Sequence, residues 1–410
     1  MPQTTLFTNG RVLDPAQGVL REGLAVLVRD GRIAEVGAGI AAPSDARVID
    51  LGGRTLMPGL IDCHMHVVAE TLDLWGNMIA PSSLAGLRAA RVMEETLQRG
   101  FTTIRDLGGA DHGLVRGIEE GLIDGPRIVI CGKGLTTTGG HADLRKRTDD
   151  RPGMMSDRLG SMGYIADGVD AVRTACRTMI KEGANFIKVM ANGGVSSPND
   201  PIHSIQYSRE EILAMVEEAE NAGLYVSAHV YTDAAIRRCV ELGVHSLEHC
   251  NLISAETAKL AAEKGCIAVP TLVAYDALWL EGKALGLGPA EFEKIEVVRA
   301  GGLNSLAIMR DAGLPMAFGS DLLGGLRKYH CMEFELLAKV LTPAEIIRSA
   351  TTVGADLCRM TEEIGTIAAG AHADLIVVDG DPLTDITRLQ DDGAHMPLIM
   401  RGGEVFKDRL

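Results

Sequence analysis

The feature that most constrains this chain is an alternation, from residue 57 onward, of short apolar segments with longer segments of helical spacing. Val169, Val172, Cys176, Met179 and Ile180 form one such helical stripe. The apolar segments lie at residues 57–66, 101–107, 127–131, 186–191, 225–230, 245–249, 267–272 and 316–320. Eight strands that alternate with helices indicate a parallel barrel. The sequence therefore predicts an α/β fold, a (β/α)₈ TIM barrel over residues 57–365.

The two ends of the chain carry a different pattern. Residues 4–56 have the pattern of short strands separated by tight turns such as Asn9-Gly10 and Asp30-Gly31. Residues 375–380 and 398–403 again show a strand followed by a turn. We expect residues 1–56 and 366–410 to join in one small β-sandwich-like domain, with the barrel inserted within it.

Charge and cysteine usage exclude several classes of function. The formal net charge is -15, whereas a nucleic-acid partner requires a basic face and an anionic membrane surface favours one. No uncharged apolar run of about 18 residues is present, so no membrane span is expected. The first ten residues do not resemble a signal peptide. The eight cysteines form no CxxC pair, which favours buried thiols in a reducing compartment. We therefore expect a cytoplasmic protein that acts on a small molecule.

Metal-ligating residue types stand at the ends of four predicted strands. His64 and His66 end the first strand, and residues i and i+2 of a strand point to the same side. His229, His249 and Asp321 end the fifth, sixth and eighth strands. Any one of these histidines could be a hydrogen-bonded core group, but barrel enzymes place their sites at this end of the strands. Imidazole with carboxylate suits Zn²⁺, with Mn, Co or Fe as possible replacements.

Lys188 ends the fourth predicted strand and therefore faces the same centre. An ammonium group cannot bind a cation, but a lysine near metals deprotonates more easily. The neutral amine can react with CO₂ to give a carbamate, whose two oxygens could bridge two metals. The alternative is an ordinary ion pair of Lys188 with Asp321 or Glu248.

This set of residues resembles the amidohydrolase superfamily of metal-dependent hydrolases. The lead-in at residues 57–62 and the segment at residues 373–379 are similar to that family as well. The resemblance implies two divalent metal ions, most simply Zn²⁺, and a bridging hydroxide whose proton Asp321 accepts. It implies a homo-oligomer, for which an octamer is one arrangement. It assigns the metal ligands as His64, His66, Asp321, His229, His249 and the carboxylated Lys188.

Several further residues are candidates for substrate contacts. Tyr231 shares the metal-facing side with His229 and could stabilise an oxyanion; the alternative is a tyrosine packed under a loop. The His229-Val230-Tyr231 segment resembles the prolidase and carboxypeptidase branch, as does His141 in its glycine-rich loop. A substrate carboxylate could instead meet the loop after the eighth strand. The candidates there, with a weaker one after the fourth strand, are Arg327, Lys328, His330 and His203.

The resemblance favours hydrolysis of an amide bond that releases a C-terminal amino acid. The substrate would be a dipeptide such as Xaa-Pro, an N-acyl amino acid, or an ochratoxin-like aryl amide. An apolar lid over a bulky acyl group is a further hypothesis, with Trp75, Met154, Met155, Met162 and Tyr164 as its members. Two other hypotheses stay open: a cyclic-amide hydrolase like imidazolonepropionase, and a barrel retained as a non-catalytic scaffold.

Overall fold

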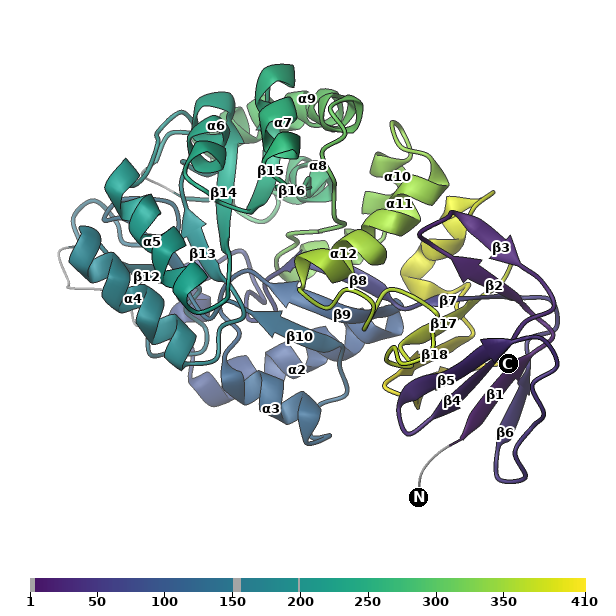
Figure 1. The fold of residues 1–410 in the computed structure, drawn as a ribbon. Helices are drawn as coiled ribbons and strands as arrows, with labels where there is room; N and C mark the ends of the chain where they lie inside the picture. The colour runs from purple at the N-terminus through teal and green to yellow at the C-terminus, as the bar shows by residue number, and fades with distance from the viewer. Residues whose placement is uncertain (1–3, 150–155, 198–199) are drawn as a thin grey trace.

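The computed structural model describes residues 4–149, 156–197 and 200–410, and it shows a helix-rich part beside a part built from sheets (Figure 1). The helix-rich part holds two sheets in which every neighbouring pair of strands is parallel. One sheet has the order β10-β9-β8, with bounds Arg127–Ile130, Phe101–Asp106 and Leu60–Met65. The other has the order β12-β11-β13-β14-β15-β16, with bounds Gly163–Ile165, Gly134–Thr136, Ile187–Met190, Val226–Thr232, Ser246–Leu252 and Ile267–Val269. The predicted α/β class is confirmed.

Backbone hydrogen bonds join these two sheets at both sides. The segment 315–321 lies between β16 and β8: the Ala317 N–H donates to Ala268 O, and the Asp321 N–H donates to His64 O. On the other side, the Asn185 N–H donates to Ile130 O of β10 over 2.7 Å. The segment 316–320, predicted as a regular strand, has a single ladder bridge, between Met316 and Ala268. Its partners change from one neighbour to the other along its length, so no continuous ladder forms.

The helices follow the strands and cover their outer side (Figure 1). Their bounds are α1 Leu74–Ile79, α2 Ser82–Gln98, α3 His112–Glu119, α4 Val169–Lys181, α5 Arg209–Asn221, α6 Asp233–Glu241, α7 Ala255–Glu263, α8 Leu272–Glu281, α9 Pro289–Asp311, α10 Met332–Leu337, α11 Pro343–Ser349 and α12 Thr352–Leu357. Three short 3₁₀ turns lie at η1 Gly324–Tyr329, η2 Ile386–Leu389 and η3 Asp391–Gly393. The predicted stripe lies on α4, with Val172, Cys176 and Met179 buried.

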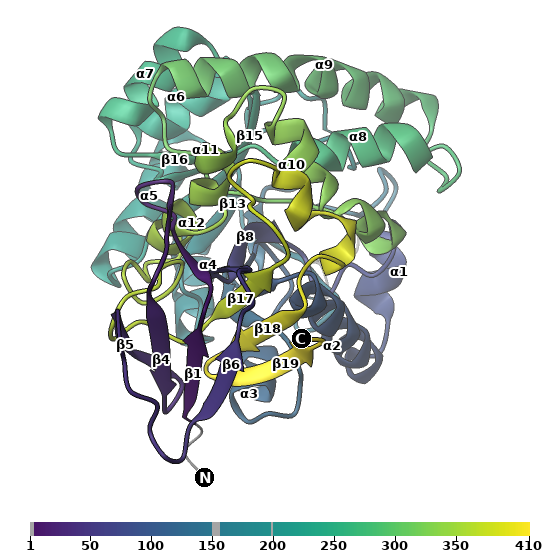
Figure 2. The ribbon, with the colours of Figure 1, turned by 90° about the vertical axis from the view of Figure 1, so that its right-hand side faces the viewer.

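Two further sheets come from both ends of the chain. The first of these sheets is turned toward the viewer in Figure 2. Its strand order is β5-β4-β1-β6, with bounds Arg32–Gly37, Ala25–Arg29, Thr5–Thr8 and Arg47–Asp50. The second has the order β19-β18-β17-β7-β2-β3, with bounds Glu404–Asp408, Leu398–Arg401, Leu375–Val378, Thr55–Pro58, Arg11–Asp14 and Val19–Arg21. Side chains of both sheets share one apolar cluster, which includes Val26, Leu56 and Val377. Because β7 extends to Pro58, this second sheet reaches past residue 56, the predicted end of the N-terminal segment.

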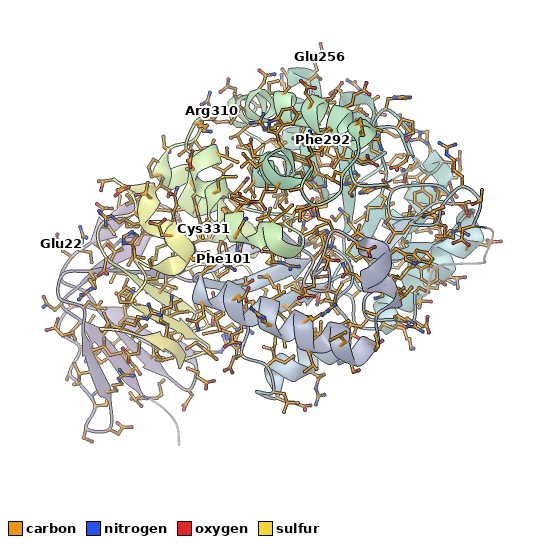
Figure 3. All side chains as sticks on the ribbon, turned by 180° about the vertical axis from the view of Figure 1, so that it is seen from behind. Glu22, Phe101, Glu256, Phe292, Arg310 and Cys331 are labelled. Carbon is orange, nitrogen blue, oxygen red and sulfur yellow. The ribbon has the colours of Figure 1, made fainter. Side chains whose placement is uncertain are left out.

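The interior is built from aliphatic side chains, cysteines and a few aromatic rings. Figure 3 shows Phe101 and Cys331 where the two parts meet, with Glu22 and Glu256 at the periphery. Phe101 is fully buried and Cys331 nearly so. All eight cysteines are buried and free, as the sequence predicts. Among the described residues, no helix is both long and apolar enough to cross a membrane.

Candidate metal centre

The first half of the centre is the pair of histidines at the end of β8. His64 and His66 are both buried, and each is held by its Nδ1 atom. His64 Nδ1 lies 2.8 Å from a carboxylate oxygen of Glu248, and His66 Nδ1 lies 3.1 Å from Gly108 O. A carboxylate and a carbonyl can only accept, so in the neutral rings both Nδ1 atoms carry the proton. Both Nε2 atoms therefore present lone pairs to the cavity.

Asp321 faces these two lone pairs. One of its carboxylate oxygens lies 3.4 Å from His64 Nε2 and 3.3 Å from His66 Nε2. Burial raises the pKa of the Asp321 carboxyl, but His64 and His66 in their protonated form outweigh burial and hold this pKa below its usual value. The three ligand atoms lie within 4.8 Å of one another. Three electron-pair donors that face one another at this spacing fit a divalent cation between them.

The second half of the centre comes from β14 and β15. The rings of His229 and His249 lie 4.6 Å apart between centroids, and His249 lies 4.9 Å from His64. Burial lowers the pKa of both imidazoles well below the usual value, so both stay neutral, the form that binds metals. His249 has φ +76° and is oriented by Thr271, whose hydroxyl lies 2.7 Å from Nδ1 and whose own φ is +50°. Left-handed backbone at such residues costs about 1–3 kcal/mol each and is typical of functional sites.

Lys188 lies on β13 and lines the same cavity. Its side chain is almost fully buried, and its Nζ makes no hydrogen bond with any residue that the structure describes. The predicted alternative, a paired lysine, is therefore not formed at hydrogen-bond distance within the described chain. Burial lowers the pKa of Lys188 to about 8, although Glu248 and Asp321 oppose the shift. A buried amine without a partner is costly, which favours a modified or otherwise compensated lysine.

A buried ion pair between Arg105 and Glu248 orients His64. The sequence did not indicate this role. The Arg105 guanidinium donates to Glu248 Oε1 over 2.6 Å, and both side chains are fully buried. Ser227 and Ser246 also donate to Oε1, over 2.7 and 2.5 Å. Burial raises the pKa of the Glu248 carboxyl, but Arg105 and His64 hold it well below its ordinary value. An ionised Glu248 fixes the tautomer of His64.

A second carboxylate, Asp62, ties β8 to the segment that carries Asp321. It accepts from the His64 N–H over 2.8 Å and from the Ser320 hydroxyl over 2.6 Å. His330 Nε2 lies 2.8 Å from the Asp62 oxygen that accepts from Ser320. The position of Asp62 in the Asp62-Cys63-His64 motif was the only sequence signal for this role.

The cavity above these residues contains His141, as the sequence predicts. Its ring stacks on that of His229 with centroids 4.2 Å apart. Its Nδ1 lies 2.6 Å from the Ser197 hydroxyl and 3.6 Å from an Asp200 carboxylate oxygen. A Cβ at Gly194 would lie 2.0 Å from His141 Nδ1, so this close approach of loop and ring requires glycine. Ser197, Asp200 and Gly194 were not identified from the sequence.

Tyr231 also lines the cavity, with its ring 5.1 Å from that of His249. Its hydroxyl accepts a hydrogen bond from the Tyr275 hydroxyl over 3.1 Å. The Tyr231 proton is therefore free to point to another acceptor. Tyr275, on α8, was not identified from the sequence.

Four predicted substrate contacts do not line the cavity. Arg327 is buried and donates from Nη2 to His66 O and Ala69 O, so it holds the backbone after β8. Lys328 pairs with Glu281. His330 bonds Asp62 and stacks on Phe101 at 4.2 Å. His203 is exposed on the loop after β13. Arg327, Lys328 and His330 are engaged by protein partners, His203 faces solvent, and none of the four lines the cavity, so the structure does not support a substrate-binding role for them.

Only one of the residues proposed for an apolar lid is found in the cavity wall. Met162 lines the cavity, whereas Trp75 and Tyr164 are not among its lining residues. Met154 and Met155 lie outside the described residues. The cavity wall is instead formed largely by leucines, namely Leu72, Leu74, Leu144, Leu278, Leu287, Leu323 and Leu326.

Comparisons with known proteins identify the family of this chain. The pattern of the amidohydrolase family matches residues 55–405. Ochratoxinase of Aspergillus niger is 33% identical over 97% of this chain and 85% of its own. Imidazolonepropionase of Deinococcus radiodurans is 27% identical over 94% of this chain and 92% of its own. The crystal structure of a prolidase complexed with N-methylphosphonate-L-proline is 45% identical, with a TM-score of 0.97 over 99% of this chain and 100% of that one. The predicted resemblance is confirmed, and the chain belongs to the amidohydrolase family.

Proposed function

We propose that this protein is a binuclear metal-dependent hydrolase that cleaves an amide bond and releases a C-terminal amino acid. Amide-bond hydrolysis is supported by the family and by its similarity to ochratoxinase and a prolidase. One observation carries the finer proposal: four histidines, Asp321 and an unpartnered buried Lys188 line one cavity. Every residue expected to bind metal is present there, which argues against a non-catalytic scaffold.

His64, His66 and Asp321 would hold one divalent cation, and His229 with His249 would hold a second. A carbamate on Lys188 would replace an amine that has no hydrogen-bond partner among the described residues by an anion able to bind a cation. When bound, the two cations, most simply Zn²⁺, would polarise the amide carbonyl and lower the pKa of a water molecule. The carbamate would also offset part of their positive charge.

Three residues of the chain would transfer the proton, stabilise the oxyanion and bind the substrate carboxylate. Asp321 is ionised because its pKa is depressed, so its carboxylate can take a proton from the attacking water and pass it to the leaving amine. The Tyr231 hydroxyl can donate to the oxygen that becomes negative. His141 can donate from Nε2 to the free carboxylate of the substrate when its Nδ1 accepts from the Ser197 hydroxyl.

The fold itself supports such a centre. We propose that β8, β9, β10 with β11, β13, β14, β15, β16 and the segment 315–321 form a closed eight-membered barrel. The hydrogen bonds on both sides of segment 315–321 support this closure. The terminal segments 1–56 and 366–410 would form a β-sandwich-like domain beside a barrel of residues 57–365. The apolar cluster that both terminal sheets share supports that division.

A release assay with metal-reconstituted protein tests the function. We expect about two equivalents of metal per chain and release of amino acid from N-acyl amino acids, dipeptides or aryl amides. A metal content that stays near zero after growth with added zinc would contradict the binuclear centre. Hydrolysis of a cyclic amide instead would favour the second candidate, an imidazolonepropionase-like activity, to which the Deinococcus radiodurans relative points. Light scattering on the same sample would test the homo-oligomer.

A further inference from the structure

The walls of the metal-centre cavity differ in chemistry from one side to the other. The polar groups on one side of the cavity stand on the segments that follow β11 and β13 and on β14 itself. They are the side chains of His141, Ser197 and Tyr231. The apolar side chains of Leu144, Met162 and Val195 share this side.

The other side of the cavity is apolar. Leu72 and Leu74 follow β8, Leu278 and Leu287 follow β16, and Leu323 and Leu326 follow the segment 315–321. Leu72, Leu74, Leu287 and Leu323 are only half-buried. Partly exposed leucines gathered on one cavity wall are suited to cover an apolar group of a ligand.

The order of strands places these two sides opposite each other. β16, the segment 315–321 and β8 are consecutive neighbours, as are β11, β13 and β14. β15 separates the two groups on one side, and β9 with β10 separates them on the other. A substrate that places its carboxylate at His141 and its scissile bond at the metal ligands therefore extends its acyl part toward the leucines.

The charges of the cavity restrict that acyl part further. Asp321 is the only carboxylate among the described residues that line the cavity, and it lies beside His64 and His66, with which it would hold a cation. Beside the leucines that follow β8, β16 and the segment 315–321, the described cavity-lining residues offer one polar side-chain group away from the metal ligands. It is the Tyr275 hydroxyl, which donates to Tyr231. An ammonium group placed here would lose its hydration without gaining a partner.

We propose that the substrate is an N-acyl amino acid whose acyl group is apolar and uncharged, in preference to a dipeptide with a free amine. Hydrolysis adds water across the C–N bond, which yields an apolar carboxylic acid and a free amino acid that takes up the released proton. This inference rests on the proposed function, because it places the scissile bond at the metal ligands.

A matched set of substrates tests the inference on the metal-loaded protein. N-hexanoyl-L-phenylalanine and L-norleucyl-L-phenylalanine share one acyl skeleton and differ by a single α-ammonium group. 6-Aminohexanoyl-L-phenylalanine carries that ammonium at the far end. We expect kcat/KM for the hexanoyl substrate to exceed both others by about tenfold or more, the low end of the cost of an unpaired charged donor. Equal or faster cleavage of the ammonium substrates overturns the inference but leaves the function intact. Cleavage of none of the three overturns both.

A charge placed on the leucine wall provides a second test. Leu323 is half-buried, so Leu323→Glu should fold, and Leu323→Gln is a control of the same size without the charge. We expect Leu323→Glu to raise the ratio of 6-aminohexanoyl to hexanoyl cleavage by about tenfold, whereas Leu323→Gln should change it by less than about threefold. An unchanged ratio in a folded Leu323→Glu protein would place the acyl group elsewhere and overturn the inference.

Discussion

Replacing Glu248 by glutamine tests whether the buried ion pair beneath the metal centre acts as the structure indicates. Glu248 accepts from Arg105, Ser227 and Ser246 at one oxygen and faces His64 Nδ1 with the other. Glutamine keeps the size and one acceptor but removes the charge. Arg105, fully buried, would then lack its counter-ion, and an amide could no longer force the proton of His64 onto Nδ1.

The expected magnitude follows from these contacts. Removing one partner of a buried pair costs about 3–5 kcal/mol of unfolding free energy. Unfolding entropy is about 2.1 cal/mol/K per residue, so for 410 residues this loss lowers Tm by about 3–6 °C. Loss of a carboxylate that orients a metal-binding histidine typically weakens metal affinity by about 10–100-fold.

Two measurements separate these effects. Thermal unfolding of the metal-free protein reports the ion pair, and chelator competition reports the affinity for Zn²⁺. Ser227→Ala is the matched control, because it removes one neutral hydrogen bond to the same oxygen and should cost only about 1 kcal/mol. A Glu248→Gln protein with wild-type Tm and wild-type metal affinity would refute both the buried charge and the tautomer argument.

The remaining predictions concern the cavity. Lys188→Ala should lose most activity and bind at least one metal more weakly, and wild-type activity in this variant would exclude a bridging carbamate. Asp321→Asn should lower kcat by about 10²-fold or more, the range for a lost general acid–base group; a change below about threefold would remove Asp321 from proton transfer. His141→Ala should cost about 1.5–3 kcal/mol in kcat/KM for N-acyl amino acids but much less for their carboxamides, and equal losses would refute carboxylate binding. Lys294 donates to the carbonyls of Gly194, Ser197 and Asp200, so Lys294→Met should raise KM by about tenfold with a smaller effect on kcat; an unchanged KM would show that the loop does not depend on Lys294.

The candidate metal ligands could be predicted from local sequence signals. The strand pattern and the i, i+2 spacing placed His64 and His66 on one side of β8, and the structure has both side chains in the cavity. His229, His249 and Asp321 followed from their positions at the ends of apolar segments. A signal of this kind depends only on strand periodicity and on the parallel direction of the strands, which the sequence carries locally.

The loop residues could not be predicted in this way. Arg327 and His330 stand in a basic loop after the eighth predicted strand, yet both turn inward to protein partners. The loop after β13 folds against His141, and this contact is what places Asp200, Ser197 and Gly194 beside the imidazole ring. The direction of a loop side chain depends on contacts across the molecule, and no periodicity in the sequence encodes it.

By itself the sequence determined the alternation of strands and helices, the burial of the cysteines and the identity of the histidines and the aspartate that line the cavity. The tertiary structure alone decided that Glu248 orients His64, a contact between residues 184 positions apart, and that His249 and Thr271 adopt left-handed backbone. It also decided that leucines from three separate segments of the chain form one wall opposite His141. The physical reason is the same in each case: the energy of a buried charge, a strained φ or an apolar wall is set by neighbours that only folding brings together.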